Sequence, residues 1–319
     1  MAYGIGDSAL LALDGRIRSV RIDACLVWQR GSLVYSYFRN PQEERELHKV
    51  NSVTKSVLSV LVGIALGRRD LGTLDASVAE YFPEAPPDKR PVTLKHLLGM
   101  TPGFEWQEAG AWGSLPPPSE QNPNWIRFIL ERKMVEPPGR RMVYNSGCSH
   151  LLSAILQKAT GMTASEYAGR YLFAPLGIDC WRWPSDAEGI SIGGFGLLLR
   201  PADLLKLGRL MLEDGRWEGN QVVPAAWIRE STLPRLPASG RDGWYGYHWW
   251  IYGKSSEGPA SPRVYYAQGF AGQFLIVVPE AQLAVVFTGD LGKKTLTPLH
   301  IFADTLFNDI KQSGAIGEE

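Results

Sequence analysis

The sequence predicts an α/β protein of the α+β type, in which a mostly antiparallel sheet is flanked by helices and carries an inserted, mainly helical lobe. Two observations support this class. Apolar, β-prone runs lie near both ends of the chain, and helical patterns separated by Pro- and Gly-rich loops fill the region between them. The pattern favours a discontinuous sheet domain over residues 1–70 and 191–319, with residues 71–190 inserted as the helical lobe.

Local patterns predict each element in turn. Apolar runs at 24–28 and 33–38, joined by a short turn segment, predict a hairpin. A long apolar helix is predicted from Val53 to about Gly67, directly after Asn51-Ser52. Further helices are predicted over residues 94–100, 125–132, 146–159, 164–173, 204–213 and 298–310, and further strands over residues 247–252, 264–267, 274–278 and 283–288.

Composition excludes several classes of function. Lysine plus arginine equals aspartate plus glutamate, 33 each among 319 residues, so neither nucleic acid nor a membrane surface is expected as a partner. The longest apolar stretch, 57–66, is interrupted by Ser59 and Gly63 and is shorter than a membrane span. Residues 1–7 have neither the basic region nor the apolar core of a signal peptide, so a cytoplasmic location is expected. The oligomeric state stays open.

Neither metal nor cofactor is expected. The three cysteines, Cys25, Cys148 and Cys180, have the spacing of neither a disulfide framework nor a zinc site. The five histidines show no HExxH motif or other paired metal spacing.

Ser52-Val53-Thr54-Lys55 places a serine and a lysine three residues apart at the start of the long helix. At this spacing the two side chains lie on one face, with Cβ atoms about 5–6 Å apart. Apolar neighbours disfavour a charged ammonium, and a neutral amine can take the proton of the serine hydroxyl. Ser-Lys pairs are a recognised variant of the hydrolase triad. The alternative is an ordinary N-cap serine followed by a solvated lysine.

Two further segments carry residues suited to the same chemistry. Tyr144 precedes a predicted helix, and a tyrosine hydroxyl near a lysine can relay protons. Ala267-Gln268-Gly269-Phe270 ends a strand with glycine, and its N–H groups could form an oxyanion hole with that of Ser52. Each segment alone also fits a structural role, as a half-buried tyrosine before a helix cap and as a bulge or strand connection.

Together and in this order, the three elements resemble the serine hydrolases built like class C β-lactamases. That superfamily includes penicillin-recognising enzymes, β-lactamase-like esterases and 6-aminohexanoate-dimer hydrolases. The resemblance covers nearly the whole chain through the segments Leu97–Gly103, Pro138–Gly147, Pro175–Gly177, Gly193–Asp203 and Tyr245–Trp250. It implies a β-lactamase/transpeptidase-like fold.

The resemblance also implies roles for single residues. Ser52 would be the acylated nucleophile, Lys55 its base partner and Tyr144 the proton relay to the leaving group. The N–H groups of Ser52 and Phe270 would hold the oxyanion. The remaining oxyanion and substrate-binding candidates are Gly269, Ser146 and Gln268.

Two departures from the family pattern indicate which class of substrate to expect. Ser146 stands where many relatives carry asparagine, and Ala267-Gln268-Gly269 stands where β-lactamases and penicillin-binding proteins carry Lys-Thr/Ser-Gly. That lysine helps to hold the substrate carboxylate, and Arg263 or Lys254 could replace it. Both departures are typical of the esterase and 6-aminohexanoate-dimer hydrolase branch. We therefore expect a small ester or linear amide as substrate. The alternatives are a β-lactamase or D-Ala-D-Ala-type peptidase and, in another class, a non-catalytic ligand-binding homologue.

A second serine motif competes with Ser52. Gly189-Ile190-Ser191-Ile192-Gly193 fits the G-x-S-x-G nucleophile elbow of α/β-hydrolases, which needs a buried strand before it and a helix directly after. Residues 183–188 predict a turn instead, and residues 194–196 are a poor helix start, so Ser52 is favoured. The residues that could complete a triad with Ser191 are His248, His300, Asp203 and Asp242.

Overall fold

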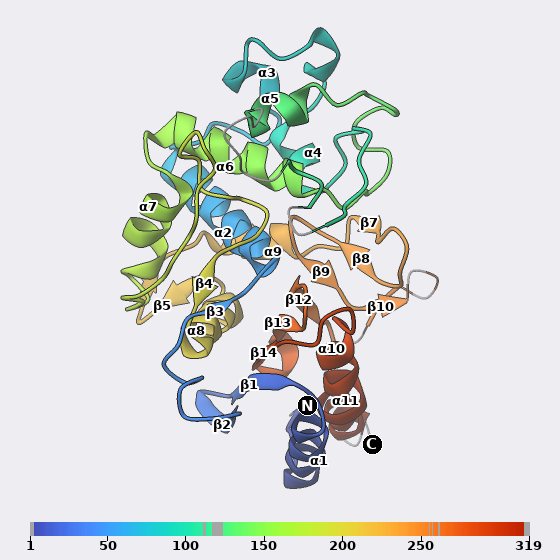
Figure 1. Cartoon of the computed structure of the whole chain (residues 1–319). Coiled ribbons are helices and arrows are strands. Elements are labelled where there is room, and N and C mark those ends of the chain that lie inside the picture. Colours follow the sequence, from blue (N-terminus) through green and yellow to red (C-terminus); the bar gives the residue numbers. More distant parts are fainter. Residues whose placement is uncertain are drawn as a thin grey trace.

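An eight-stranded antiparallel sheet forms the centre of the computed structural model, which describes residues 3–110, 113–116, 124–254, 256, 258–260 and 262–315 (Figure 1). The strand order is β2-β1-β14-β13-β12-β9-β8-β7. The strands are β1 (Ile22–Gln29), β2 (Ser32–Phe38), β7 (Leu236–Pro237), β8 (Trp244–Tyr245), β9 (Trp250–Ile251), β12 (Tyr265–Gly269), β13 (Gln273–Val278) and β14 (Leu283–Gly289). Strands from the two ends of the chain therefore share one sheet, as the sequence predicts. The domain boundaries at residues 70 and 190 stay a prediction.

Every residue of the central strand β13 is buried, because helices cover both faces of the sheet. Helix α8 (Pro201–Leu212) packs on β13 and β14, where Gly208 lets the helix approach Leu275 and Ala284 closely. Helix α1 (Asp7–Arg18) packs with the C-terminal helices α10 (Thr297–Phe302) and α11 (Asn308–Ala315) on the other side (Figure 1). The two ends of the described chain thus lie side by side.

Helix α2 (Val53–Arg68) runs through the middle of the molecule. All of its residues from Val53 to Ala65 are buried, as expected for a helix that is packed on every side. It contacts β12 of the sheet, α6 (Ser146–Thr160) and α9 (Ala225–Ser231). Gly63 faces the Trp227 ring so closely that a Cβ would overlap it, and the Trp227 indole N–H donates to the Ser59 carbonyl at 2.9 Å. This packing fixes the position of the helix that carries the Ser-Lys pair.

The remaining elements are short. The other helices are α3 (Val78–Tyr81), α4 (Leu94–Leu98), α5 (Trp125–Leu130) and α7 (Ala164–Ala168), with 3₁₀ turns at Pro87–Lys89 and Pro279–Ala281 and π-helical turns at Gly169–Phe173 and Ala303–Phe307. The small strand pairs are β3 (His48–Lys49) with β4 (Leu198–Leu199), β5 (Arg216–Trp217) with β6 (Asn220–Gln221), and β10 (Gly253–Lys254) with β11 (Gly258–Pro259).

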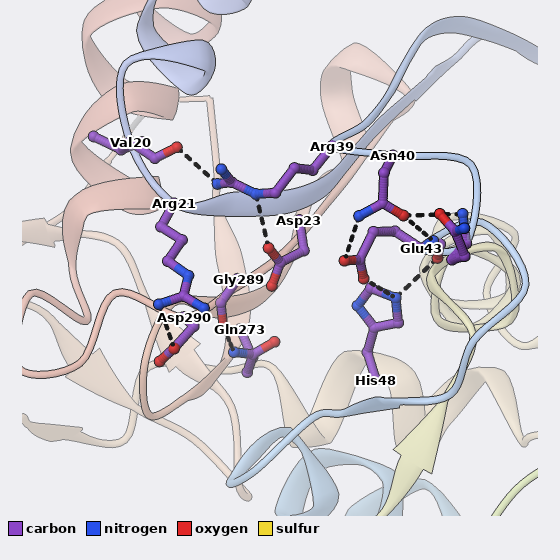
Figure 2. Close-up of polar contacts among 11 residues, drawn as sticks. Val20, Arg21, Asp23, Arg39, Asn40, Glu43, His48, Gln273, Gly289 and Asp290 are labelled. Atoms are coloured by element: carbon purple, nitrogen blue, oxygen red, sulfur yellow. Dashed lines mark hydrogen bonds and ion pairs between the residues drawn. The ribbon is translucent and has the colours of Figure 1, made fainter.

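Polar contacts hold the segment that leads from β2 to α2 (Figure 2). Arg39 Nε donates to Asp23 on β1 at 3.0 Å, and Asn40 Nδ2 donates to the Glu43 carboxylate at 3.1 Å. The His48 ring lies 2.8 Å from the Glu43 carbonyl oxygen. Strand β3 pairs with β4 and lies just before Ser52 at the N-terminus of α2, so this pairing helps to fix the position of Ser52.

Most predicted elements are confirmed, including the N-terminal hairpin, α2, α6 and the last three strands. The single strand predicted over 247–252 is wrong, because His248 has a φ of 63° and the chain turns between β8 and β9. The continuous helix predicted over 298–310 is interrupted by a π-helical turn. Helices α1, α3 and α9 were not predicted.

His248 is buried at the junction of three elements. Its N–H donates to the Leu98 carbonyl at 3.1 Å, its carbonyl accepts from Ser56 Oγ at 2.6 Å, and its Nε2 lies 3.0 Å from Ser149 Oγ. Burial, together with the nearby Lys55, lowers the pKa of His248 to about 3. The imidazole is therefore neutral throughout the physiological range.

This burial predicts an acid-sensitive fold. As the pH falls from about 6.5 towards 3, the unfolded chain binds a proton at His248 that the folded chain cannot, so the free energy of unfolding falls by up to about 1.4 kcal/mol per pH unit. In the His248→Asn variant, asparagine tolerates the positive φ and the titrating imidazole is gone. The free energy of unfolding of this variant should therefore depend less steeply on pH. Urea unfolding between about pH 7 and pH 4 measures both slopes. Equal slopes would contradict the prediction.

Candidate active site

Lys55 lies at the centre of a hydrogen-bonded cluster and is 1% exposed. Its Nζ is 3.1 Å from Ser52 Oγ, 3.0 Å from Ser146 Oγ and 2.6 Å from the Gly194 carbonyl oxygen. These partners come from the start of α2, the start of α6 and the segment before β4. Although Ser52 is the N-cap residue of α2, its side chain makes no capping bond, so its hydroxyl is available to the lysine.

Glu108 completes the cluster and was missed by the sequence analysis. Its carboxylate accepts a hydrogen bond from Ser146 Oγ, one from the Ser146 N–H at 2.9 Å and one from the Trp106 indole N–H at 2.9 Å. A carboxylate at the N-terminus of α6 is also favoured by the helix dipole. Glu108 lies in a loop with no periodic pattern, so no sequence feature marks it.

The bonds around Glu108 fix the direction in which Lys55 can act. Because the Ser146 hydroxyl donates to Glu108, its oxygen is left to accept from Nζ, and the Gly194 carbonyl can only accept. Nζ is also within hydrogen-bond distance of Ser52 Oγ. A deprotonated amine that donates to Ser146 and to Gly194 would direct its lone pair towards Ser52 Oγ, as a general base requires.

Tyr144 lies against the same lysine. Nζ is 4.7 Å from the centroid of the Tyr144 ring, which in turn stacks on Trp250 with centroids 5.5 Å apart. The described residues form no hydrogen bond to the Tyr144 hydroxyl, and the Tyr144 side chain is half-buried. The structure thus brings Ser52, Lys55 and Tyr144 together.

The backbone at Ser52 and Phe270 offers two N–H donors. In the described part of the chain neither N–H donates to a protein acceptor. Gly269 approaches Val50 so closely that a Cβ would overlap the Val50 carbonyl oxygen, which explains the glycine at this position. The end of β12 and the start of α2 are therefore in direct backbone contact, as an oxyanion hole built from both requires. The Phe270 side chain is 59% exposed.

Arg241 contacts the third sequence element. Its Nη1 donates to Gln268 Oε1 at 2.6 Å, and its guanidinium carbon lies 3.2 Å from the centroid of the Trp250 ring. Nε and Nη2 have no hydrogen-bond partner among the described residues. From the sequence, Arg263 or Lys254 could supply the positive charge that the family's lysine provides beside this element. Instead, Arg241 reaches Gln268, and Arg263 lies over the Tyr265 ring.

Ser191 lacks the features of a nucleophile elbow. It is fully buried, its Oγ accepts from the Ser165 N–H at 3.1 Å, and no helix follows it. The ring of His248 faces Ser149 rather than Ser191. Across the described ranges, no three His, Cys, Asp or Glu residues are placed to hold a metal ion. No helix of the described chain is both long and apolar enough to cross a bilayer. A cytoplasmic location stays a prediction.

Glu108→Gln tests the cluster. The amide cannot accept both Ser146 bonds in the same way, so the Ser146 hydroxyl loses its fixed direction. We expect a loss of roughly 10- to 100-fold in kcat, part of the ~10²–10⁴ that a positioned acid–base group supplies. Steady-state hydrolysis of p-nitrophenyl butyrate measures it. The control is Glu105→Gln, which changes an exposed carboxylate in the same loop. Equal kcat values for the two variants would rule out the role of Glu108.

The chain is similar to known proteins in both sequence and fold. The Beta-lactamase family model matches residues 17–293. The 6-aminohexanoate-dimer hydrolase of Paenarthrobacter ureafaciens is 25% identical over 271 aligned residues, which cover 76% of this chain and 67% of that protein.

Solved structures share the fold. One is a putative 6-aminohexanoate-dimer hydrolase from Bacillus anthracis, with a TM-score of 0.82, 20% identity and coverage of 95% of this chain and 82% of that one. Another is EstCE1, a hydrolase with promiscuous acyltransferase activity, with a TM-score of 0.76, 16% identity and coverage of 94% and 98%.

Proposed function

The chain belongs to the beta-lactamase family, and from this premise we propose that it hydrolyses small esters and linear amides through an acyl-enzyme formed on Ser52. The observation that carries the assignment is the position of Lys55 Nζ, 3.1 Å from Ser52 Oγ and held from behind by Ser146 and Gly194. A lysine so constrained has one productive direction, towards the serine hydroxyl.

Acylation follows from these positions. Lys55 takes the proton of Ser52 Oγ while the oxygen attacks the substrate carbonyl carbon, and the carbonyl oxygen becomes an oxyanion between the N–H groups of Ser52 and Phe270. As the tetrahedral intermediate collapses, the bond to the leaving group breaks, and the leaving alcohol or amine receives a proton from the Tyr144 hydroxyl. Lys55 then donates the proton it took from Ser52 to Tyr144. Water then attacks the acyl-enzyme and the same base accepts its proton. As the second tetrahedral intermediate collapses, the base returns that proton to Ser52 Oγ, and the acid is released.

The neighbours of the site favour esters and linear amides over β-lactams. No lysine stands at Ala267 or Gln268 to hold a β-lactam carboxylate in the usual way of the family. The names of two similar proteins, a 6-aminohexanoate-dimer hydrolase and a hydrolase with acyltransferase activity, point to the same branch. β-Lactam hydrolysis is the second candidate, because the family model itself carries that name.

Ser52→Ala should abolish turnover of p-nitrophenyl butyrate and labelling by a fluorophosphonate, because the other described hydroxyl beside Lys55, that of Ser146, is engaged with Glu108. Ser191→Ala removes only a buried acceptor for the Ser165 N–H, costs about 1–3 kcal/mol of stability, and should keep activity. Mass spectrometry of the labelled protein locates the adduct. An active Ser52→Ala protein would refute the assignment. Efficient turnover of a cephalosporin without ester turnover would replace it with the β-lactamase alternative.

Arg241 places a positive charge on the side of the site that holds Tyr144. Its guanidinium stacks on Trp250, and Trp250 stacks on Tyr144. Two of its nitrogens have no hydrogen-bond partner among the described residues. Since Tyr144 faces the leaving group, a leaving group that carries a carboxylate complements this charge. A 6-aminohexanoate dimer is a linear amide of that class.

Two acetyl esters that differ by one methyl group test this substrate class. Wild-type protein should hydrolyse 4-acetoxybenzoate with a higher kcat/KM than its methyl ester, because only the former presents a carboxylate. Arg241→Gln should reduce that preference by roughly 10-fold, about 1.4 kcal/mol, and leave the methyl ester little changed. Release of the phenol is followed by absorbance. An unchanged preference in the variant would exclude Arg241 from substrate binding.

A further inference from the structure

Asn51 has an unusual backbone conformation immediately before the nucleophile. Its φ is 49°, in the left-handed region that few residues other than glycine adopt and that asparagine tolerates best. From this conformation its side-chain Nδ2 donates to the Phe270 carbonyl oxygen at 2.8 Å, across 219 positions of sequence. A strained residue beside a reacting group suggests that its contact has a function.

The Phe270–Ala271 peptide, whose carbonyl accepts from Asn51, makes further hydrogen bonds to neighbouring segments. Gln273 Nε2 donates to the Gly289 carbonyl at 2.6 Å (Figure 2). The same Nε2 lies 3.4 Å from the Phe270 oxygen. The N–H of Ala271, in the same peptide unit, donates to Thr295 Oγ1 at 3.1 Å. The turn after β12 is therefore anchored to β14 and to the segment before α10. Only Asn51 ties it to the start of α2 by a side-chain hydrogen bond among the described residues.

We propose that Asn51 is a positioning residue that sets the spacing between the two oxyanion donors, the N–H groups of Ser52 and Phe270. The inference rests on the proposed function, since it assigns no role without an oxyanion. Such donors act only when both lie about 2.7–3.1 Å from the developing charge. Because a displacement of about 1 Å can cost on the order of 100-fold in rate, a direct link between the two segments protects catalysis. Asn51 itself touches no reacting atom.

Two substitutions separate the hydrogen bond from the backbone conformation. Asn51→Gly suits the positive φ and removes the amide, so this variant should fold as well as the wild type. Asn51→Asp keeps the shape but places an acceptor against the Phe270 carbonyl oxygen, which repels that peptide. Asn220→Gly, the same replacement at an exposed position on β6, is the control.

The test compares p-nitrophenyl butyrate with its thiono analogue, O-(p-nitrophenyl) thionobutyrate. Sulfur is larger and accepts hydrogen bonds weakly, so an intact oxyanion hole favours the oxygen ester. For Asn51→Gly and Asn51→Asp we expect kcat for the oxygen ester to fall roughly 10- to 100-fold, with KM within about twofold. The ratio of kcat/KM for the oxygen ester to that for the thionoester should fall by a similar factor. Asn220→Gly should match the wild type in both.

Each result decides the inference. A variant that is folded by thermal denaturation yet keeps the wild-type ratio overturns the role of Asn51, even where kcat falls, because loss of activity alone fits a merely structural residue. A wild-type protein that neither hydrolyses the oxygen ester nor accepts a fluorophosphonate overturns the proposed function, and this inference with it. An active wild type with a collapsed ratio in both variants supports it.

Discussion

The contact of the Lys55 amine with three oxygen atoms is the constraint on which the site depends. An amine that is 1% exposed is costly to bury unless its polar hydrogens are satisfied. Here a hydroxyl and a carbonyl from two other segments satisfy them, and the third oxygen belongs to Ser52. The hydrogen bonds that compensate for the burial of the lysine therefore also direct its amine towards Ser52 Oγ.

The fold supplies the rigidity that this arrangement needs. α2 is enclosed by the sheet and by helices, and close approaches at Gly63 and Gly208 leave little room for the layers to slide. The acceptors of the lysine come from α6 and from the Gly194 segment, whose glycines touch the backbone and side chains of α6. A packed core does not deform continuously, so distances of about 3 Å across these three chain segments can be maintained.

Local patterns predicted much of this molecule. The Ser52–Lys55 pair, Tyr144 and the glycine-ended strand lie together as the motifs implied, because each is marked by residue type at fixed spacing next to a regular element. Glu108, Arg241 and Asn51 could not be found in that way. Their contacts span between 27 and 219 positions and arise from packing of loops, for which the sequence has no periodic feature. The strand predicted through His248 failed for a related reason, since a positive φ at a histidine is imposed by its surroundings.

The contact between Asn51 and Phe270 joins positions near the two ends of the chain. During synthesis, Ser52 and Lys55 leave the ribosome long before Phe270 has been made, and the partners of Lys55 on α6 and at Gly194 also follow later. A nascent chain thus carries the serine without the Phe270 N–H, the second of the two proposed oxyanion donors. Under the proposed function, reactivity would arise only at the end of synthesis, when the β13–β14 hairpin pairs with β1.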